Sequence, residues 1–481
     1  MFVSRVLPWV TIAATTAPSG SLAATDPAPA GEKPNIIFIL ADDLGYTDVG
    51  CYGSRYYETP HIDRMASQGM RFTHGYTCGP NCQPTRAALM SGQYAPRTGV
   101  YTVGDIDRFN WRSRPLQPVD NAVRLPVNKT TVAQALKTVG YTTALFGKWH
   151  LGEDGPYHPR QRGFDEAIVS MGRHFNFRTN PHVDYPPGTY LADFLTDKAV
   201  DFVHRNRTKP FFLCLHHFAV HTPHQAKQNL IARFKPKAAA GGHHDPTYAA
   251  MIASIDESVG RLMAAIDELG LAERTLLIFS SDNGGVGGYR REGLTRAGDI
   301  TDNAPLRGGK GMLYEGGVRV PYIFRRPGVI PAGVICEQPI NSVDLFPTLL
   351  DVAGARPPRE YPLDGVSYLP VLTSGGKATL PRDALFWHFP GYLGSGDGQW
   401  RTLPVGTIRS GDWKLLEFFE DGRLELYNLR QDVGETRNLA SVMPDKAKEL
   451  QARLADWRKQ VGARMPEPRP DSRPARVSAP R

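Results

Sequence analysis

Asn35-Ile36-Ile37-Phe38-Ile39-Leu40-Ala41-Asp42-Asp43 is the stretch that decides the fold. Its first part, residues 35–40, is an almost continuous apolar run with the length of one β-strand. Such a run, without alternation of apolar and polar residues, is typical of a strand that is buried on both faces of a parallel sheet. Two adjacent carboxylates, Asp42 and Asp43, follow directly, so the sequence predicts a buried strand that ends at a charged site.

Three further segments repeat this arrangement of a short apolar run followed by polar residues. Strands are predicted over residues 141–146, 211–215 and 276–279, and the polar residues after them include Lys148, His150, His221, Asp282 and Asn283. Helices are predicted around these strands, over residues 132–139, 190–205 and 248–269. This alternation predicts an α/β fold with a large domain built on a central, mainly parallel sheet flanked by helices. In such folds ligands bind at the carboxyl ends of the strands, where these polar residues fall.

The pattern changes near residue 381. Residues 413–420 and 423–429 flank Asp421-Gly422, a strong hairpin signal, and residues 384–389 and 405–409 are expected as companion strands. A final helix carries one apolar face, made by Ala447, Leu450, Leu454, Trp457 and Val461. We therefore expect the large domain over residues 34–380 and a small C-terminal α+β domain with an antiparallel sheet over residues 381–464. The Pro- and Arg-rich tail, residues 465–481, is expected to be disordered.

The first residues have the pattern of an export signal. Arg5 is followed by a mostly apolar segment, residues 6–17, and then by Ser21-Leu22-Ala23, which fits the small-x-small pattern of a cleavage site. We expect a signal peptide at residues 1–23, a short leader at residues 24–33 and an exported protein. The apolar segment is too short and too interrupted for a transmembrane helix, so no membrane span is expected.

The formal net charge of +8 is a mild excess of positive charge over 481 residues. The chain has no long run of like charge, so a nucleic-acid partner is not expected. The excess fits an anionic substrate, although a solvated basic surface is the commoner explanation. The five cysteines are too few for a dense disulfide framework and predict no particular pairing. The oligomeric state stays open.

A second stretch, Cys82-Gln83-Pro84-Thr85-Arg86-Ala87-Ala88-Leu89-Met90-Ser91-Gly92, carries the chemistry. Proline is well tolerated at the start of a helix, where its missing N–H would be unpaired anyway. Cys82 is therefore expected at a helix N-terminus, where backbone N–H groups favour an anion. Arg86 lies one turn further on and can point its guanidinium at the same place. Taken alone, such a cysteine is more often a small buried structural residue.

Read with its neighbours, the stretch resembles the signature of the type I sulfatases, which belong to the alkaline phosphatase superfamily. The family pattern is Cys-x-Pro-Ser/Thr-Arg followed by Leu/Met-Ser/Thr-Gly, and Cys82 to Gly92 fits it. Matches to further family motifs follow in the same order, and the resemblance spans about residues 33–440. These matches are Gly147-Lys148-Trp149-His150-Leu151-Gly152, His221-Thr222-Pro223, Gly308-Gly309-Lys310-Gly311, and Asp432-Val433-Gly434-Glu435 with Asn438-Leu439.

The resemblance implies that Cys82 is oxidised to formylglycine by a formylglycine-generating enzyme, and that the hydrated aldehyde is the nucleophile. It also implies a calcium site, with the ligands Asp42, Asp43, Asp282, Asn283 and the modified residue 82. The residue types agree with this site, because hard oxygen ligands select Ca²⁺, or less favourably here Mg²⁺, rather than zinc. An Asp-Asp pair by itself is more often a solvated turn.

Catalytic roles for the other motif residues are implied in the same way. Lys148 and Lys310 neutralise the sulfate oxygens, and Arg86 supports residue 82. His221 gives a proton to the leaving oxygen, with Lys310 as a possible helper, and His150 takes a proton from the second hydroxyl of the hydrated aldehyde. Lys148, His221 and Lys310 are thus expected to bind the substrate.

The expected reaction is the hydrolysis of a sulfate ester, and a sulfated saccharide or polysaccharide fits an exported, basic protein. Arg173 and His174 lie in residues 171–187, a segment rich in Arg, His, Asn and aromatic residues, and are candidates to bind substrate at the pocket mouth. An ordinary surface loop explains that segment equally well.

Two other functions would require different residues at these positions. A phosphatase or phosphodiesterase of the same superfamily usually carries a Ser or Thr nucleophile and zinc ligands of Asp/His type, which Cys82 and the Asp/Asn set do not match. A carbohydrate-binding protein with an inactive site would lack some of Lys148, His150, His221 and Lys310, and all four are present.

Overall fold

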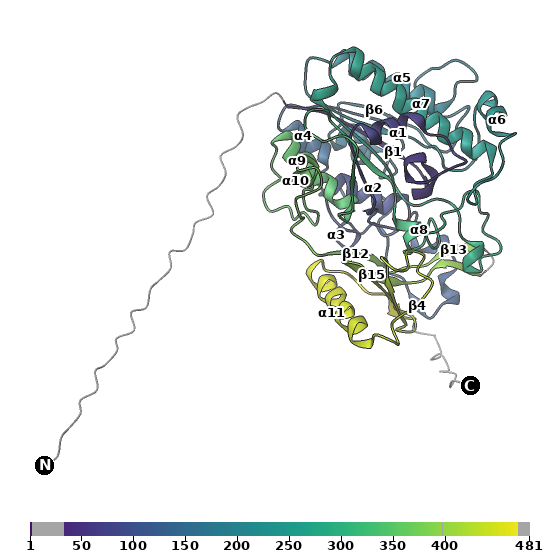
Figure 1. Ribbon diagram of the computed structural model, residues 1–481, viewed down its shortest axis with the longest axis vertical. Coiled ribbons are helices and arrows are strands. Elements are labelled where there is room, and N and C mark those ends of the chain that lie inside the picture. The colour runs from purple at the N-terminus through teal and green to yellow at the C-terminus, as the bar shows by residue number, and fades with distance from the viewer. Residues whose placement is uncertain (2–32, 397, 470–481) are drawn as a thin grey trace. The chain divides into compact units, whose positions relative to one another are not determined.

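The computed structural model describes residues 1, 33–396 and 398–469, and the described residues from Lys33 to Arg469 form one compact unit (Figure 1). The predicted signal peptide, and the leader apart from Lys33, lie outside the described residues except for Met1. In the described part of the chain, no helix is both long enough and apolar enough to cross a membrane.

An eight-stranded, mostly parallel sheet forms the centre of this unit. β1 lies in the middle of it and pairs in parallel with β7 on one side and β8 on the other. β9 runs antiparallel to both β8 and β2, and the remaining pairs are parallel. In spatial order the strands are β10 (Val334–Cys336), β2 (Met70–Phe72), β9 (Tyr322–Arg325), β8 (Thr275–Ser281), β1 (Asn35–Ala41), β7 (Phe211–His216), β5 (Thr142–Gly147) and β6 (Glu166–Val169).

Helices cover both faces of this sheet (Figure 1). Alternate residues of β1 enter different cores: Ile37 packs with the helices of one face and Phe38 with those of the other. This double burial explains why the β1 sequence is apolar throughout. The first face carries α1 (Pro60–Ser67), α5 (Leu191–Arg205), α6 (Gln228–Phe234) and α7 (Pro246–Glu268); the second carries α2 (Cys82–Ser91), α4 (Val132–Lys137), α9 (Leu345–Ala353) and α10 (Leu369–Thr373).

A smaller antiparallel sheet of four strands follows, in the order β12-β15-β16-β17. One of its faces packs on the last helix, α11, and the other packs on the main unit, so that Leu415 and Leu416 point into different cores. These elements are β12 (Ala384–Phe389), β15 (Val405–Ser410), β16 (Trp413–Phe418), β17 (Leu424–Asn428) and α11 (Pro444–Gln460). The shorter elements are α3 (Ala95–Thr98), α8 (Glu315–Val318), β3 (Gly75–Tyr76) paired with β11 (Ile340–Asn341), and the hairpin β13 (Leu393–Gly396) with β14 (Gln399–Thr402).

A buried ionic cluster joins the two sheets. Lys414 of β16 lies 2.9 Å from a carboxylate oxygen of Glu315, the first residue of α8, and 2.9 Å from one of Glu435, and all three side chains are fully buried. The second oxygen of Glu435 accepts a hydrogen bond from the Glu315 backbone N–H at 2.7 Å. Because none of these three side chains reaches water, the small sheet and α8 of the main unit depend on each other for charge compensation.

The predicted fold class is confirmed, with shifted element ends. The helix predicted over residues 132–139 ends at Lys137, and the hairpin strand predicted over residues 413–420 ends at Phe418. The division into domains at residues 34–380 and 381–464 stays an interpretation, because the shared cores and the ionic cluster join the two parts.

The expected disorder of residues 465–481 was wrong for the first residues of that segment. β18 (Glu467–Pro468) pairs with β4 (Leu116–Gln117), and the Arg469 N–H donates to the Pro115 carbonyl at 2.9 Å. The first residues of the tail thus supply hydrogen-bond partners for backbone groups of an exposed loop. The polar composition of the tail did not reveal this pairing. Residues 470–481 lie outside the described residues.

Candidate active site

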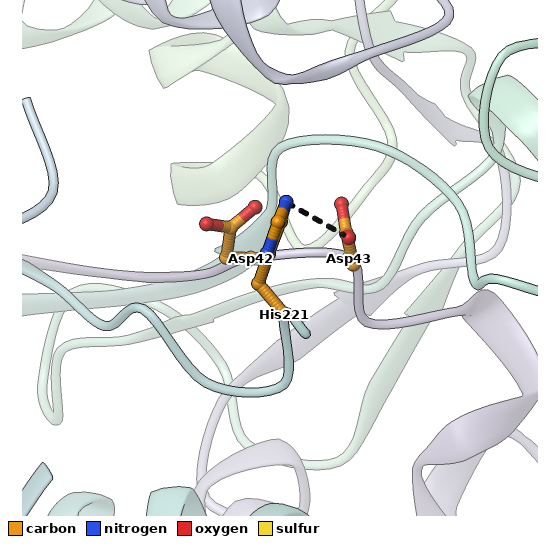
Figure 2. Close-up of side chains that lie close together, drawn as sticks. All are labelled: Asp42, Asp43 and His221. Carbon is orange, nitrogen blue, oxygen red and sulfur yellow. Dashed lines mark ion pairs between the residues drawn. The ribbon is translucent and has the colours of Figure 1, made fainter. Parts of the chain in front are cut away.

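Two carboxylates at the end of β1 form the centre of the candidate site. Asp42 and Asp43 are 0% and 1% exposed, and the His221 ring lies between them in Figure 2. Asp43 has a φ of 64°, a left-handed conformation that turns the chain away from the strand direction. One oxygen of each side chain is neutralised by a lysine: Lys148 Nζ lies 2.5 Å from Asp42 Oδ2, and Lys310 Nζ lies 2.7 Å from Asp43 Oδ2.

The end of β8 adds a third carboxylate and an amide. Asp282 accepts hydrogen bonds from the Asp43 backbone N–H at 3.2 Å and from Arg86 Nε at 2.8 Å. Asn283 donates from Nδ2 to Asp43 Oδ1 at 2.8 Å. Two oxygens in this group, Asp42 Oδ1 and Asn283 Oδ1, are buried and have no hydrogen-bond partner in the described structure. Buried oxygens of this kind are normally satisfied, so the pair fits ligands of a hard cation.

Cys82 is the first residue of α2 and is 2% exposed. Its sulfur and one oxygen each of Asp42 and Asp282 lie within 4.8 Å of one another. The helix begins at Cys82 itself, and Pro84 occupies its third position. Burial raises the pKa of the thiol, against the effect of Lys148. An unmodified Cys82 is thus held as the neutral thiol, which is the poorly nucleophilic form.

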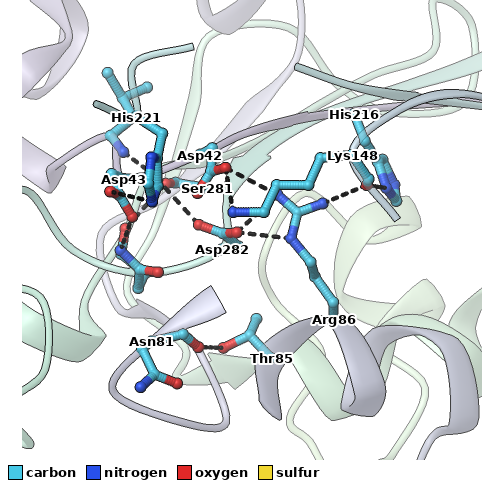
Figure 3. Close-up of polar contacts among 12 residues, drawn as sticks. Asp42, Asp43, Asn81, Thr85, Arg86, Lys148, His216, His221, Ser281 and Asp282 are labelled. Carbon is cyan, nitrogen blue, oxygen red and sulfur yellow. Dashed lines mark hydrogen bonds and ion pairs between the residues drawn. The ribbon is translucent and has the colours of Figure 1, made fainter. Parts of the chain in front are cut away.

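Arg86 ties α2 to two strand ends, as Figure 3 shows. Its Nη2 lies 2.7 Å from Asp282 Oδ2, and its Nη1 donates to the Lys148 carbonyl at 2.7 Å. The side chain is 1% exposed, so this guanidinium has no contact with bulk water. It holds the helix that starts at Cys82 in register with the carboxylate cluster.

Lys148 and His150 follow β5. His150 has a φ of 61°, so the backbone is not extended there. Lys148 is buried against Asp42, whereas His150 lines the cavity described below. Burial, and next the charge of Lys148, lower the pKa of His150 far below its ordinary value. The ring is therefore neutral, and its buried Nδ1 has no partner among the described residues.

His221 and Lys310 approach Asp43 from different loops. His221 Nε2 lies 3.7 Å from Asp43 Oδ2, and its Nδ1 is 2.7 Å from the Thr222 carbonyl. Burial lowers the pKa of His221 to about 4, opposed by Asp43. Burial alone would raise the pKa of Asp43, but Lys310 and then His221 hold it below its ordinary value.

These residues surround a cavity of about 420 Å³, a size in the usual range for small-ligand sites. Asp43, Cys82, His150, His221 and Lys310 all line it. Its lining also includes residues that the sequence motifs did not identify: Asn81, Val103, Arg108, Phe109, His224, Val286, Leu393, Gly394 and Arg401. They come from loops and from the β13–β14 hairpin, and no short-range pattern connects these segments with the strand ends.

Arg173 and His174, the predicted substrate contacts, are not among the residues that line this cavity. His174 is 1% exposed and stacks on Phe218, with 4.9 Å between ring centroids. Its Nε2 lies 2.8 Å from the His221 carbonyl, so it supports the His221 loop from behind. Arg173 is exposed at the surface. A contact of Arg173 with substrate stays a prediction, and the position of His174 favours a supporting role.

Family models match nearly the whole described chain. The Sulfatase model covers residues 34–355, and the model described as N-sulphoglucosamine sulphohydrolase, C-terminal, covers residues 309–460.

Individual relatives agree with these matches. A sulfatase of Formosa agariphila is 35% identical, over 89% of each chain. Mouse steryl-sulfatase is 31% identical over 77% of this chain and 70% of its own length, and dog N-acetylgalactosamine-6-sulfatase is 33% identical over 75% and 70%. Among solved structures, Ps i-CgsB in complex with k-i-k-neocarrahexaose superposes with a TM-score of 0.74 at 30% identity, over 89% of this chain and 93% of the other.

Proposed function

The chain belongs to the sulfatase family and is a sulfuric ester hydrolase, and from this we propose that it hydrolyses a sulfate ester of a saccharide with a formylglycine made from Cys82 and a calcium ion. One observation carries the proposal: Cys82 begins a helix at the base of a cavity, within 4.8 Å of the Asp42 and Asp282 carboxylates. A formylglycine-generating enzyme would be the partner that modifies Cys82 in an exported precursor.

The modification supplies what the cysteine lacks. A hydrated aldehyde at residue 82 offers hydroxyl oxygens where the buried thiol offers only a neutral sulfur. Arg86 fixes the helix that carries the residue through its ion pair with Asp282, and this preorganises the position of the nucleophile.

Asp42, Asp43, Asp282, Asn283 and the modified residue 82 would hold the calcium ion. The unpartnered Asp42 Oδ1 and Asn283 Oδ1 support this set. When bound, the ion supplies Lewis-acid polarisation of oxygens at the site. Lys148 and Lys310, which are paired with Asp42 and Asp43, would neutralise the substrate's sulfate oxygens with their ammonium groups.

The two histidines that line the cavity would move protons. His150, neutral and with an unpartnered nitrogen, is suited to accept a proton from residue 82. His221 is neutral in the free protein, and the negative charge of a sulfate ester favours its protonated form. It can then donate to the leaving oxygen, beside the positive charge of Lys310.

A saccharide is the preferred substrate class for two reasons. Besides the apolar side chains of Val103, Phe109, Val286 and Leu393, the cavity lining carries arginine, histidine, lysine and asparagine side chains, which suit a hydroxylated, anionic ligand better than a sterol. N-acetylgalactosamine-6-sulfatase and the carrageenan-bound Ps i-CgsB also point to saccharides, although steryl-sulfatase is a relative of similar identity.

A substrate panel tests this choice. Enzyme co-produced with a formylglycine-generating enzyme would be assayed on sulfated mono- and disaccharides, a steryl sulfate, 4-nitrophenyl sulfate and 4-nitrophenyl phosphate. We expect at least one saccharide sulfate to exceed the steryl sulfate in kcat/KM by tenfold or more. A preference for the steryl sulfate, or for the phosphate ester, would contradict the proposal.

A further inference from the structure

We propose that Arg401 forms a second anion-binding subsite in the active-site cavity, which selects substrates carrying another negatively charged group besides the sulfate that is cleaved. This inference rests on the proposed function, since it assigns the substrate class of the same site. The second group is a sulfate or a carboxylate on the same saccharide.

Arg401 is brought to the cavity by the C-terminal part of the chain. It lies in β14 and lines the cavity together with Leu393 and Gly394 of β13. This hairpin is far along the chain from the strand ends that carry the carboxylates. Cys82, His150, His221 and Lys310 line the same cavity. A ligand that fills it therefore touches both the catalytic residues and this hairpin.

The Arg401 guanidinium is not neutralised by any carboxylate of the described residues. In the described part of the chain it forms no ion pair, and its Nε is buried without a hydrogen-bond partner. The cavity's carboxylate Asp43 is already paired with Lys310, and Glu292, which lines an adjoining hollow together with Arg401, is paired with Arg307. A partly buried guanidinium without a carboxylate loses hydration and gains no ion pair in return, which is the condition in which an anionic ligand binds well.

The position of Arg401 is built rather than incidental. Its guanidinium carbon lies 4.5 Å from the centroid of the Tyr289 ring, and Tyr289 is fully buried. The Tyr289 hydroxyl donates to the Lys310 carbonyl at 2.8 Å. One aromatic ring thus positions both the arginine and the loop that carries the catalytic lysine.

Gly311 provides the room for this arrangement. A Cβ atom at Gly311 would lie 3.2 Å from Arg401 Cδ and 2.5 Å from a Leu393 methyl carbon, so a side chain there would displace the arginine and the hairpin. Gly311 directly follows Lys310. The absence of a side chain at this position therefore lets the Lys310 loop pack closely against the aliphatic part of Arg401.

Arg108 strengthens the positive field at the cavity mouth. It is exposed, lines the cavity and forms no ion pair among the described residues, while its guanidinium lies 5.3 Å from the Phe109 ring centroid. Two arginines without partner carboxylates thus face the same ligand space, beyond the lysines that the cleaved sulfate requires. A planar guanidinium binds sulfate or carboxylate through two parallel hydrogen bonds, which explains the choice of arginine here.

The test compares ligands that differ by one charge. The inhibition constants of disaccharides of one backbone would be measured against 4-nitrophenyl sulfate hydrolysis, with one sulfate, with two sulfates, or with one sulfate and one carboxylate. We expect wild-type enzyme to prefer a doubly charged ligand over the singly charged one by at least tenfold, and Arg401→Gln to reduce this ratio to about two or less. The sulfate and carboxylate arms distinguish the two kinds of second group.

Arg112→Gln is the matched control, because Arg112 is an exposed arginine that pairs with Asp107 outside the cavity lining. It removes the same charge and should keep the wild-type ratio. Equal weakening of all ligands by Arg401→Gln, an unchanged ratio with a lowered Tm, or no preference in the wild type would overturn the inference. If aryl sulfate hydrolysis is absent, the proposed function fails, and calorimetric binding of the same ligands still decides the role of Arg401.

Discussion

Arg86 Nη2 lies 2.7 Å from Asp282 Oδ2, and the two side chains are 1% and 0% exposed. This buried pair connects the helix that begins with Cys82 to the end of β8. Through its Nη1, the same arginine also holds the Lys148 carbonyl at 2.7 Å. A single side chain therefore fixes the start of the helix at Cys82, the Asp282 carboxylate and the backbone at Lys148.

Arg86→Leu should be strongly destabilising, because it leaves a buried carboxylate without its partner. We expect a loss of about 3–5 kcal/mol in the free energy of unfolding, measured by urea denaturation. The control is Arg112→Leu, which breaks an exposed pair with Asp107 and should cost less than about 1 kcal/mol. Similar losses in the two variants would show that the buried pair contributes no more to stability than the exposed one.

Divalent calcium should stabilise the protein in proportion to its occupancy of the site. Chelation is expected to remove activity and lower the Tm, and Ca²⁺ at a hundredfold excess over its Kd should restore about 2–3 kcal/mol of stability. Asn283→Ala removes the unpartnered Asn283 Oδ1 and should reduce the Ca²⁺-dependent rise in Tm, whereas Asn206→Ala, at the end of α5, should leave it unchanged. Full restoration of a stripped enzyme by Zn²⁺ alone, but not by Ca²⁺, would refute the oxygen-ligand site.

His221→Ala should affect substrates according to their leaving group. A proton donor matters most when the leaving alcohol is a poor one, so kcat on a saccharide sulfate should fall about 10²-fold or more. The loss on 4-nitrophenyl sulfate should be much smaller, because its phenolate leaves without assistance. Equal losses on both substrates would remove His221 from the role of proton donor.

The buried cluster of Glu315, Lys414 and Glu435 should make stability depend on pH. Burial raises the pKa of Glu435 to about 7, with Lys414 opposing and Glu315 adding to the rise, while Glu315 stays ionised. A carboxyl whose pKa is higher in the folded state stabilises the fold at low pH, and this contribution is lost as pH rises from about 4.5 to about 7.

The variant Glu435→Gln, which cannot ionise, isolates this effect. The free energy of unfolding of this variant minus that of wild type should be larger at pH 7.5 than at pH 5, by roughly 2–3 kcal/mol. Urea denaturation of both proteins at the two pH values measures it. A difference of zero, or of the opposite sign, would mean that folding does not raise the pKa of Glu435.

The residues at the carboxyl ends of the strands could be predicted, because a short apolar run in the sequence is enough to locate each strand. A run such as residues 35–40 specifies a strand buried on both faces, and Asp42 and Asp43 must then lie at its end. Cys82 and Arg86 were predictable from helix geometry and motif spacing. Arg401 was not, because its position depends on a hairpin far along the chain and on the room above Gly311.

Tertiary contacts decide other positions that composition does not. His174 lies in a segment whose composition suggests a ligand-binding surface, whereas its ring packs against Phe218 and its Nε2 lies beside the His221 carbonyl, a position that favours a supporting role. The antiparallel pairing of β18 with β4 uses backbone groups whose partners no composition reveals. Glu435 was recognised only as part of a C-terminal motif. Its contact with Glu315 gives the motif a physical role, because it anchors the start of α8, five residues after Lys310.

The central claim is that residue 82 acts as a formylglycine. Wild-type protein would be produced with and without a formylglycine-generating enzyme, the peptide that contains residue 82 weighed by mass spectrometry, and turnover of 4-nitrophenyl sulfate measured on the same samples, with Cys82→Ala as the reference. The account predicts that turnover rises in proportion to the fraction of peptide lighter by the change from thiol to aldehyde, and that Cys82→Ala folds but has no turnover. Full turnover in Cys82→Ala, or in wild-type protein whose residue 82 is entirely cysteine, would contradict it.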